Sequence, residues 1–497
     1  MLLSDWIMQS FACRPQRQYF IPDMTTKPAH FKKCEHYLKS LCVDIADRSV
    51  GSEGNRASTR FFESELRASG WATQMPEFDA IDWHNGGASL TVETDKKSRK
   101  SSYNGSEKAT NGVGFDVRVS PYSKGYAGVS ELAEVSTVDA LEKGSFRDMI
   151  VLLHGEIAAE QLMPKSFVFY NPEEHRRIVA ALESSGAAAL VCATGRNPEL
   201  AGGMYPFPLI EDGDFDIPSV YMTEEGGLRL LPHAGKKVRL ISRSERIPGK
   251  ACNVIGRKGG SGSTIEARQK DTSDPARGTA PGYASGITPG SDPGNPAPEQ
   301  DGANTGIDTT GRIVITAHID AKKGTPGAID NATGVTVLLL LADLLREYDG
   351  PMPLEIVAFN GEDYYAVPGQ MDYLASNRNN FNRVALNINI DGVGYREGPS
   401  ACSYFGLPEH IHQKAKELLE SGVGIVEGEP WVEGDHSIFL QHGRPAIAVT
   451  SAWMLEHMHD QTITHTPADT IDNVDCGKLV ELAVALKHFL TAVGTCD

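Results

Sequence analysis

From residue 312 to residue 493, short apolar runs alternate with segments in which apolar residues recur every three or four positions. Such runs predict strands, and the clearest are RIVITAH at 312–318, LEIVAFN at 354–360 and VALNINID at 384–391. The segments with helical spacing predict helices at 332–348, 370–376, 408–421 and 475–493. This alternation is typical of a sheet that is covered by helices on both faces. We therefore predict an α/β fold with a doubly wound, mostly parallel central sheet.

The pattern is different in the first half of the chain. Residues 28–70 have helical spacing, and strands are expected at 71–78 and 88–92. From about residue 113, short strands such as DMIVLLHG and AALVCATG flank a helix, and no catalytic residue types cluster. A chain of 497 residues exceeds one ordinary core. We expect a smaller β-rich domain, residues 113–245, inserted into a main domain made of residues 28–112 and 246–497.

One segment of the main domain has almost no large apolar residue. Residues 259–310 consist mostly of Gly, Ser, Pro, Thr and Asp. Such a segment cannot bury enough apolar surface to offset the entropy of ordering it. We expect a flexible insertion at the surface, which a domain tolerates because a longer loop costs little.

Charge and cysteine content restrict the partners. The 65 acidic and 47 basic residues give a net charge of −18, which argues against nucleic acid and anionic membranes as partners. No run of about 20 apolar residues is present, and the amino-terminal segment lacks the basic-then-apolar order of a secretory signal. The eight cysteines form no C-x-x-C pair. We expect a cytoplasmic protein, with the oligomeric state left open and a dimer as one alternative.

Candidate chemistry gathers where the predicted strands end. Carboxylates and histidines follow three strands of one sheet, begin the next helix, or lie in a late loop; they are His318, Asp320, Asp330, Glu362, Asp363, Asp391 and His465. Because the carboxyl ends of parallel strands meet at one edge, these side chains are expected to lie together. Imidazole and carboxylate groups are common ligands of divalent metals.

Taken singly, each of these residues has an ordinary structural explanation. His318 and Asp320 could form a hydrogen-bonded pair, and the Asp330-Asn331 pair is a good helix N-cap. Asp391 precedes a glycine, which is a common turn signal. Their joint occurrence at consecutive strand ends favours a metal site over coincidence.

A pair of metal ions explains the whole set. Two metals about 3.5–4 Å apart need a bridging carboxylate, terminal ligands and a shared water. Mixed imidazole and carboxylate ligands favour zinc, with cobalt and manganese as alternatives. Of the adjacent Glu362 and Asp363, one can bind metal while the other acts as a base. Asp320 is expected to accept the spare N–H of His318 and fix its tautomer.

The chain resembles a known family at these residues. The segments AHID, GAIDNATGV, AFNGED, NINIDGVG, GDHSIF and HTPADT are similar, in the same order, to motifs of the co-catalytic zinc exopeptidases. That family includes aminopeptidase Y, bacterial leucyl aminopeptidases and glutamate carboxypeptidases, with glutaminyl cyclases as a divergent branch. The matching motifs cover roughly residues 250–475. The resemblance implies a zinc exopeptidase fold, and the inserted domain resembles a protease-associated domain.

The resemblance also implies a role for each position. Asp330 would bridge two divalent metal ions, expected to be Zn2+, with His318 and Asp391 completing one site and Asp363 and His465 completing the other. Glu362 would be the general base, and Asp320 is counted with it as a catalytic residue. The implied activity is hydrolysis of amino-terminal residues from a peptide substrate by a metal-activated water.

Two positions depart from the family pattern. Asp363 stands where most relatives have Glu, which is one methylene longer. Thr464 stands where some relatives have a Tyr that stabilises the oxyanion; Tyr364, Tyr365 and Tyr395 are alternatives for that role. Asp435-His436 matches a family loop near the site, and we expect it to support that loop.

The same residues also fit other functions. A dipeptidase or carboxypeptidase would use the same ligands, and a glutaminyl-cyclase-like enzyme would use one metal. A catalytically inactive scaffold with this fold would be expected to have lost ligands, whereas this chain retains every ligand type.

Overall fold

The computed structural model describes residues 27–493 with several gaps, which are residues 46, 94–111, 166, 168–170, 197–204, 260–310, 364–366, 421–423, 433 and 459. From residue 260 onwards, the insertion expected at 259–310 lies outside the described residues. Within the described residues, no helix is both long enough and apolar enough to cross a membrane.

The central sheet has eight strands in the order β1-β10-β12-β11-β13-β16-β14-β15. Its strands are β1 (Ala72–Gln74), β10 (Val254–Lys258), β11 (Arg312–His318), β12 (Leu354–Phe359), β13 (Val384–Ile390), β14 (Ser400–Phe405), β15 (Ile425–Glu427) and β16 (Ala446–Ser451). The four middle strands β12, β11, β13 and β16 are mutually parallel, and antiparallel pairs flank them. The predicted α/β fold with a mostly parallel centre is confirmed.

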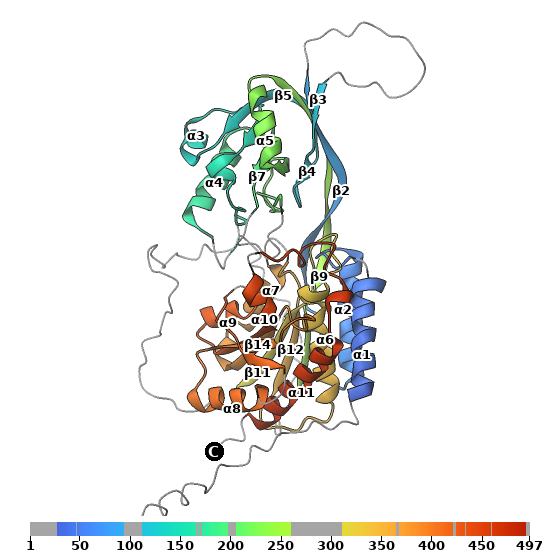
Figure 1. Cartoon of the computed structure of the whole chain (residues 1–497). Coiled ribbons are helices and arrows are strands. Elements are labelled where there is room, and N and C mark those ends of the chain that lie inside the picture. Colours follow the sequence, from blue (N-terminus) through green and yellow to red (C-terminus); the bar gives the residue numbers. More distant parts are fainter. Residues whose placement is uncertain are drawn as a thin grey trace, which may run out of the picture.

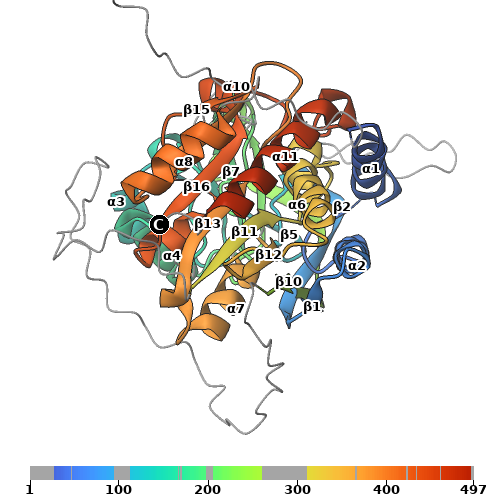
Figure 2. The same cartoon turned by 90° about the horizontal axis from the view of Figure 1, so that it is seen from below.

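Helices cover both faces of this sheet (Figure 2). The elements of the main domain are α1 (Lys27–Lys39), α2 (Glu53–Ala68), α6 (Thr333–Leu344), α7 (Pro368–Asn377), α8 (Glu409–Leu419), α9 (Ser437–Gln441), α10 (Ala452–His457) and α11 (Cys476–Ala492). Alternate residues of β11 point into the hydrophobic cores on opposite faces of the sheet. Ile313 and Ile315 pack with α6 and α11, whereas Val314 packs with Tyr373 of α7. Nearly every residue of α6 is buried, which explains its almost continuously apolar sequence.

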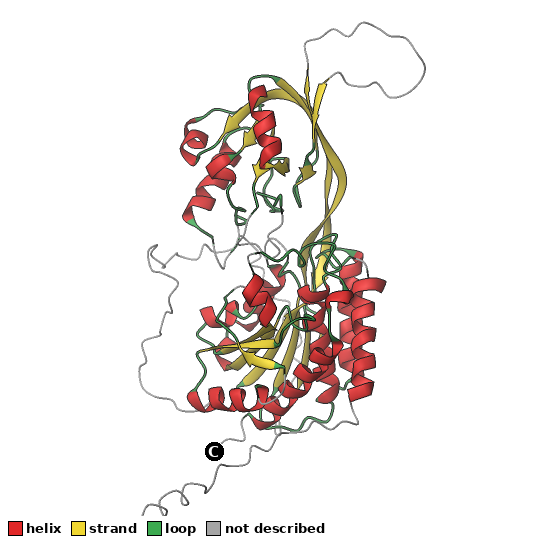
Figure 3. Cartoon of the chain, viewed as in Figure 1, coloured by secondary structure: helices red, strands yellow, loops and turns green. Residues whose placement is uncertain are grey.

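A second eight-stranded sheet, in the order β3-β2-β9-β5-β6-β7-β8-β4, forms a separate lobe (Figures 1 and 3). Its strands are β2 (Glu77–Glu93), β3 (Gly112–Phe115), β4 (Arg118–Val119), β5 (Tyr126–Val135), β6 (Ile150–Leu153), β7 (Ala189–Thr194), β8 (Ser219–Thr223) and β9 (Lys237–Cys252). Three helices accompany them, α3 (Val138–Lys143), α4 (Glu173–Ser184) and α5 (Glu224–Leu230). Short helical turns elsewhere cover Ser40–Asp44, Gly155–Ala158, Leu231–His233, Ala328–Ala332, Phe381–Arg383 and Ile471–Asn473.

A long antiparallel pair joins the two lobes. β2 runs unbroken for 17 residues and pairs with β9 along its length, with a register shift between Asn85 and Ala88. The sequence suggested separate strands at 71–78 and 88–92, whereas Gly86-Gly87 lies at the register shift inside one strand. A bulge absorbs such residues without ending the strand. The second sheet therefore already includes residues 77–93, which precede the domain boundary that we expected at residue 113.

A buried arginine ties the amino-terminal helices to the central sheet. Arg48 is 2% exposed and donates hydrogen bonds to the backbone carbonyls of Leu41, Ile319, Pro326 and Gly327. The last three of these belong to the loop that follows β11. A planar guanidinium with five donors suits several fixed carbonyls at once.

Replacing Arg48 by Ala should therefore lower the free energy of unfolding by about 3 kcal/mol or more, because several buried carbonyls lose their donor. Urea denaturation followed by circular dichroism measures this change. Arg60→Ala, at an exposed position of α2, is the matched control and should change stability by about 0.5 kcal/mol at most. Equal stability of the two variants would show that Arg48 does not brace this loop.

Candidate metal centre

The candidate residues follow neighbouring strands at one edge of the central sheet. β11 and β12 are parallel and in register, so His318 lies beside Phe359, and Glu362 and Asp363 follow three and four residues after Phe359. β13 ends at Ile390, immediately before Asp391. The loop after β11 returns Asp330 to this edge, and the loop after α10 brings His465.

The carboxylate of Asp330 lies between two imidazoles. Its Oδ1 is 3.0 Å from Nε2 of His318, and its Oδ2 is 2.9 Å from Nε2 of His465. Asp391 Oδ1 lies 3.5 Å from the same nitrogen of His318, and Asp363 Oδ1 lies 3.1 Å from that of His465. Two groups that could each hold a metal ion result, and they share Asp330.

The first group consists of His318, Asp330 and Asp391, and the second of Asp330, Asp363 and His465. In each group the ligand atoms lie within 4.8 Å of one another. Each group combines one imidazole with two carboxylates, which is a donor set suited to zinc. The structure thus brings together all five ligands expected from the sequence.

The hydrogen bonding of His318 also fits a metal ligand. Its side chain is 1% exposed, and within the described part of the chain neither ring nitrogen makes a well-aligned hydrogen bond, although Nε2 lies 3.0 Å from Asp330 Oδ1. A buried polar atom without a partner is costly in a folded protein. A cation coordinated by Nε2 would satisfy that nitrogen.

Negative charge is crowded at this edge. Burial and the carboxylates of Asp363 and Asp391 raise the pKa of Glu362 well above its usual range, although His318 acts in the opposite direction. Burial likewise raises the pKa of Asp391. Burial lowers the pKa of His465, but Asp363 and Asp330 more than reverse this, so it lies well above its usual range. Bound cations would relieve the repulsion among the carboxylates.

Asp320 does not act as we expected. Its Oδ1 lies 3.8 Å from Nδ1 of His318, which is too far for a hydrogen bond. Its carboxylate instead accepts the backbone N–H groups of Gly361, Glu362 and Asp363, at 2.7, 3.2 and 3.0 Å. Three donors from one turn occupy the carboxylate because Asp320 and this turn follow adjacent strands. Asp320 is therefore a positioning residue for the Glu362-Asp363 turn.

The structure also shows which residue of the Asp330-Asn331 pair caps the next helix. Asn331, and not Asp330, caps α6: its Oδ1 accepts the backbone N–H of Gly334 at 2.9 Å. Its Nδ2 donates to the carbonyl of Ile390 at the end of β13. The Asp330 carboxylate remains available to face the two histidines.

Asp469 was not among the residues expected from the sequence. This fully buried side chain accepts the backbone N–H of Ile329 at 2.7 Å and that of Asp330 at 3.1 Å. Burial raises the pKa of Asp469 to about 7. Its place in the HTPADT segment, four residues after His465, was the available signal. Asp469 fixes the backbone from which the shared carboxylate extends.

Of the three tyrosines considered for the oxyanion role, Tyr395 lies within the described residues. Tyr395 is buried against Trp453, with ring centroids 4.3 Å apart, and pairs with Val474. Thr464 is buried too, and its hydroxyl accepts a hydrogen bond from Gln461 at 2.6 Å. Tyr364 and Tyr365 lie outside the described residues.

The Asp435-His436 pair lies beside the ligands without joining either group. Asp435 is 3% exposed, and its Oδ1 accepts a hydrogen bond of 2.6 Å from Gln370. Burial raises the pKa of Asp435 to about 7, with His318 acting in the opposite direction. Nε2 of His436 lies 2.9 Å from the backbone carbonyl of Trp431, so this imidazole holds its own loop as expected.

Residues 300–490 match the protein family described as peptidase family M28. In sequence the chain is similar to aminopeptidase YwaD of Bacillus subtilis (strain 168), with 24% identity over 192 residues. That match covers 35% of this chain and 40% of the relative, so it spans less than half of the relative's length.

Solved structures with the same fold cover nearly the whole chain. The aminopeptidase from Aneurinibacillus sp. strain AM-1 has a TM-score of 0.63 at 18% identity, covering 94% of this chain and 95% of its own. BSAP, a zinc aminopeptidase from Bacillus subtilis, has a TM-score of 0.60 at 16% identity, with the same coverage. At these identities the similarity confirms the expected zinc exopeptidase fold.

Asp330→Asn tests the shared carboxylate directly. The amide keeps the shape of the side chain but loses the charge that two cations would share, so the variant should stay folded and bind at most one metal per chain. Metal analysis by mass spectrometry after equilibration with zinc measures this. Asp472→Asn, at an exposed position nearby, should bind as much metal as the wild type. Equal metal content in Asp330→Asn would contradict a bridging role.

Proposed function

We propose that the protein is a zinc-dependent aminopeptidase that uses two metal ions, since residues 300–490 match peptidase family M28. The observation that carries the proposal is the sharing of Asp330 between two complete ligand groups. Bound there, a metal pair would supply a Lewis acid for the scissile carbonyl and lower the pKa of a shared water. The remaining steps belong to side chains of this chain.

Glu362 is suited to move the proton. It is a member of neither ligand group, and its Oε2 is 3.9 Å from Nε2 of His318, with 28% of the side chain exposed. A carboxylate that binds no metal is free to accept a proton, as a general base must. We infer that Glu362 takes a proton from the attacking water and returns it to the leaving amine.

Asp320 supports this role through the backbone. Its carboxylate holds the N–H of Glu362 and the N–H of the ligand Asp363, so one side chain orients both the base and a metal ligand. Such support matters because a misplacement of about 1 Å in reacting groups can cost about a hundredfold in rate.

Preference for an amino terminus is supported by charge. The ligand edge is crowded with carboxylates, and the buried Asp435 adds another beside His318 and Asp391. This environment favours the ammonium group of a substrate over its carboxylate. Both similar structures named above are described as aminopeptidases.

The alternatives fit the described site less well. A cyclase that uses one metal would not need the second group of Asp330, Asp363 and His465, which is complete here. An inactive scaffold would have no need to keep a base beside two complete groups.

Glu362→Gln should lower kcat at least a hundredfold while metal content stays near that of the wild type, because the base lies outside both ligand groups. Stopped assays with a panel of aminoacyl chromogenic amides, run beside metal analysis, measure both quantities. Glu347→Gln, at an exposed position, is the matched control and should keep full activity. Retained turnover, or loss of metal together with turnover, would refute the role assigned to Glu362.

A further inference from the structure

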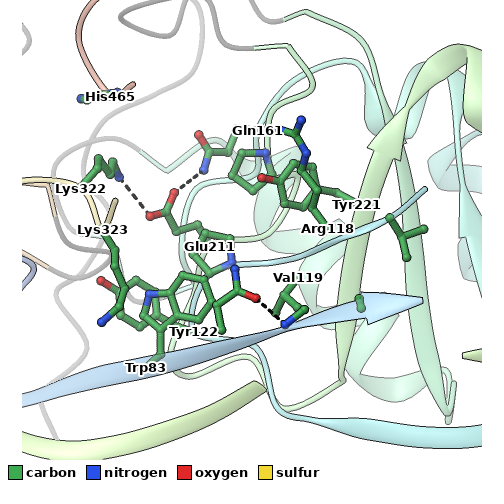
Figure 4. A pocket seen from close by; sticks show the side chains of 16 residues that line it. Trp83, Arg118, Val119, Tyr122, Gln161, Glu211, Tyr221, Lys322, Lys323 and His465 are labelled. Carbon is green, nitrogen blue, oxygen red and sulfur yellow. Dashed lines mark hydrogen bonds and ion pairs between the residues drawn. The ribbon is translucent and has the colours of Figure 1, made fainter. Parts of the chain in front are cut away.

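A pocket of about 450 Å³ joins the metal centre to the second lobe. His465 lies at its edge, and its far wall comes from β2, β4 and β8 of the second sheet (Figure 4). The volume lies within the range of sites that bind small molecules. Aromatic and aliphatic side chains line much of it, among them Trp83, Val119 and Tyr122. The rings of Trp83 and Tyr122 pack at a centroid distance of 6.0 Å.

The charges that line this pocket are mainly positive. Arg118, Lys322 and Lys323 face a single acidic residue, Glu211. In a chain with a net charge of −18, this is a local reversal of sign. The pocket is therefore electrostatically opposite to the carboxylate-rich ligand edge that it adjoins.

Both lysines already have partners. Lys322 Nζ lies 3.1 Å from Glu211, and Lys323 Nζ lies 2.6 Å from Asp82. Arg118, by contrast, has no carboxylate within ion-pair distance in the part of the chain that the structure describes. Its guanidinium lies against Tyr221, whose pKa burial raises and Arg118 partly lowers. Arg118 is the cation of this pocket that remains available to a ligand.

The pocket is also fixed relative to the metal ligands. The backbone N–H of Lys322 donates to Asp363 Oδ2 at 3.1 Å, and the side chain of Lys322 reaches Glu211, which also accepts a hydrogen bond from Gln161. Figure 4 shows the contacts of Glu211 with Lys322 and Gln161, with His465 and Arg118 on different sides of the pocket. One residue therefore links a metal ligand to the second lobe.

We propose that this pocket binds the carboxyl-terminal part of a short peptide, with Arg118 pairing with the free terminal carboxylate. The inference rests on the proposed aminopeptidase function, because it places the scissile bond at the metal centre. The substrate would then lie along the gradient of charge, with its ammonium group at the acidic edge and its carboxylate at Arg118. The apolar wall would contact the side chains between them.

The competing occupant is the side chain of the amino-terminal residue. That arrangement would bring the ammonium group close to Lys322, Lys323 and Arg118, where like charges repel. The Arg118 guanidinium would also lack a ligand partner, because most amino-terminal side chains carry no negative charge. The arrangement of charges thus favours the leaving part of the peptide.

The test compares each peptide with its carboxyl-terminal amide, using tripeptides that share one amino-terminal residue. Binding is measured by calorimetry on the zinc-loaded Glu362→Gln protein, with and without Arg118→Ala, so that the result does not depend on turnover. We expect Arg118→Ala to weaken binding of the free acid by about tenfold to a hundredfold. The difference in affinity between the free acid and its amide should become smaller. Arg118→Lys should retain part of that difference, since it keeps the charge but not the fork of donors.

Arg239→Ala is the matched control, because Arg239 pairs with Glu93 on the second sheet and does not line the pocket. It should bind both peptides as the Glu362→Gln protein does. An unchanged ratio of acid to amide binding in Arg118→Ala would overturn the proposal. Failure of the wild type to hydrolyse aminoacyl amides would instead count against the proposed function, and the binding comparison would still decide the role of Arg118.

Discussion

The contact of one carboxylate with two imidazoles determines the arrangement of this site. One oxygen of Asp330 faces His318 and the other faces His465, so a small rotation of the side chain would disrupt both ligand groups. The backbone on either side is accordingly fixed: Asp469 accepts the N–H of Asp330, and Asn331 caps the following helix. Asp330 thus joins the end of β11 to the start of α6 and to the loop that carries His465.

The same constraint explains the buried polar residues around the centre. Carboxylates brought this close repel one another, and their backbone must be held against that repulsion. Asp320 does so for the Glu362-Asp363 turn through three N–H groups, and Arg48 does so for the loop after β11 through carbonyl oxygens. The second lobe contributes through the pair of Glu211 and Lys322, which connects the pocket wall to a metal ligand. Both lobes therefore contribute contacts to the candidate site.

Much of this arrangement was predictable from the sequence, because it follows local rules. Apolar runs that end in His318 and Asp391 mark strands of a parallel sheet, and parallel strands deliver their ends to one edge. What was missed depends on contacts between distant segments. Asp469 bonds to a backbone 139 positions away, a relation that no periodicity records. Asp320 was assigned to its sequence neighbour His318, whereas the turn after the adjacent strand β12 supplies better donors. The pocket likewise arises only when the two lobes come together.

The most direct test of this account is a crystal structure of the zinc-loaded protein with anomalous data collected on both sides of the zinc absorption edge. We expect two anomalous peaks about 3.5–4 Å apart, one beside His318 and Asp391, the other beside His465 and Asp363. One oxygen of Asp330 should reach each peak. A single peak, or two peaks with Asp330 bound to neither, would contradict the claim that one shared carboxylate organises the site.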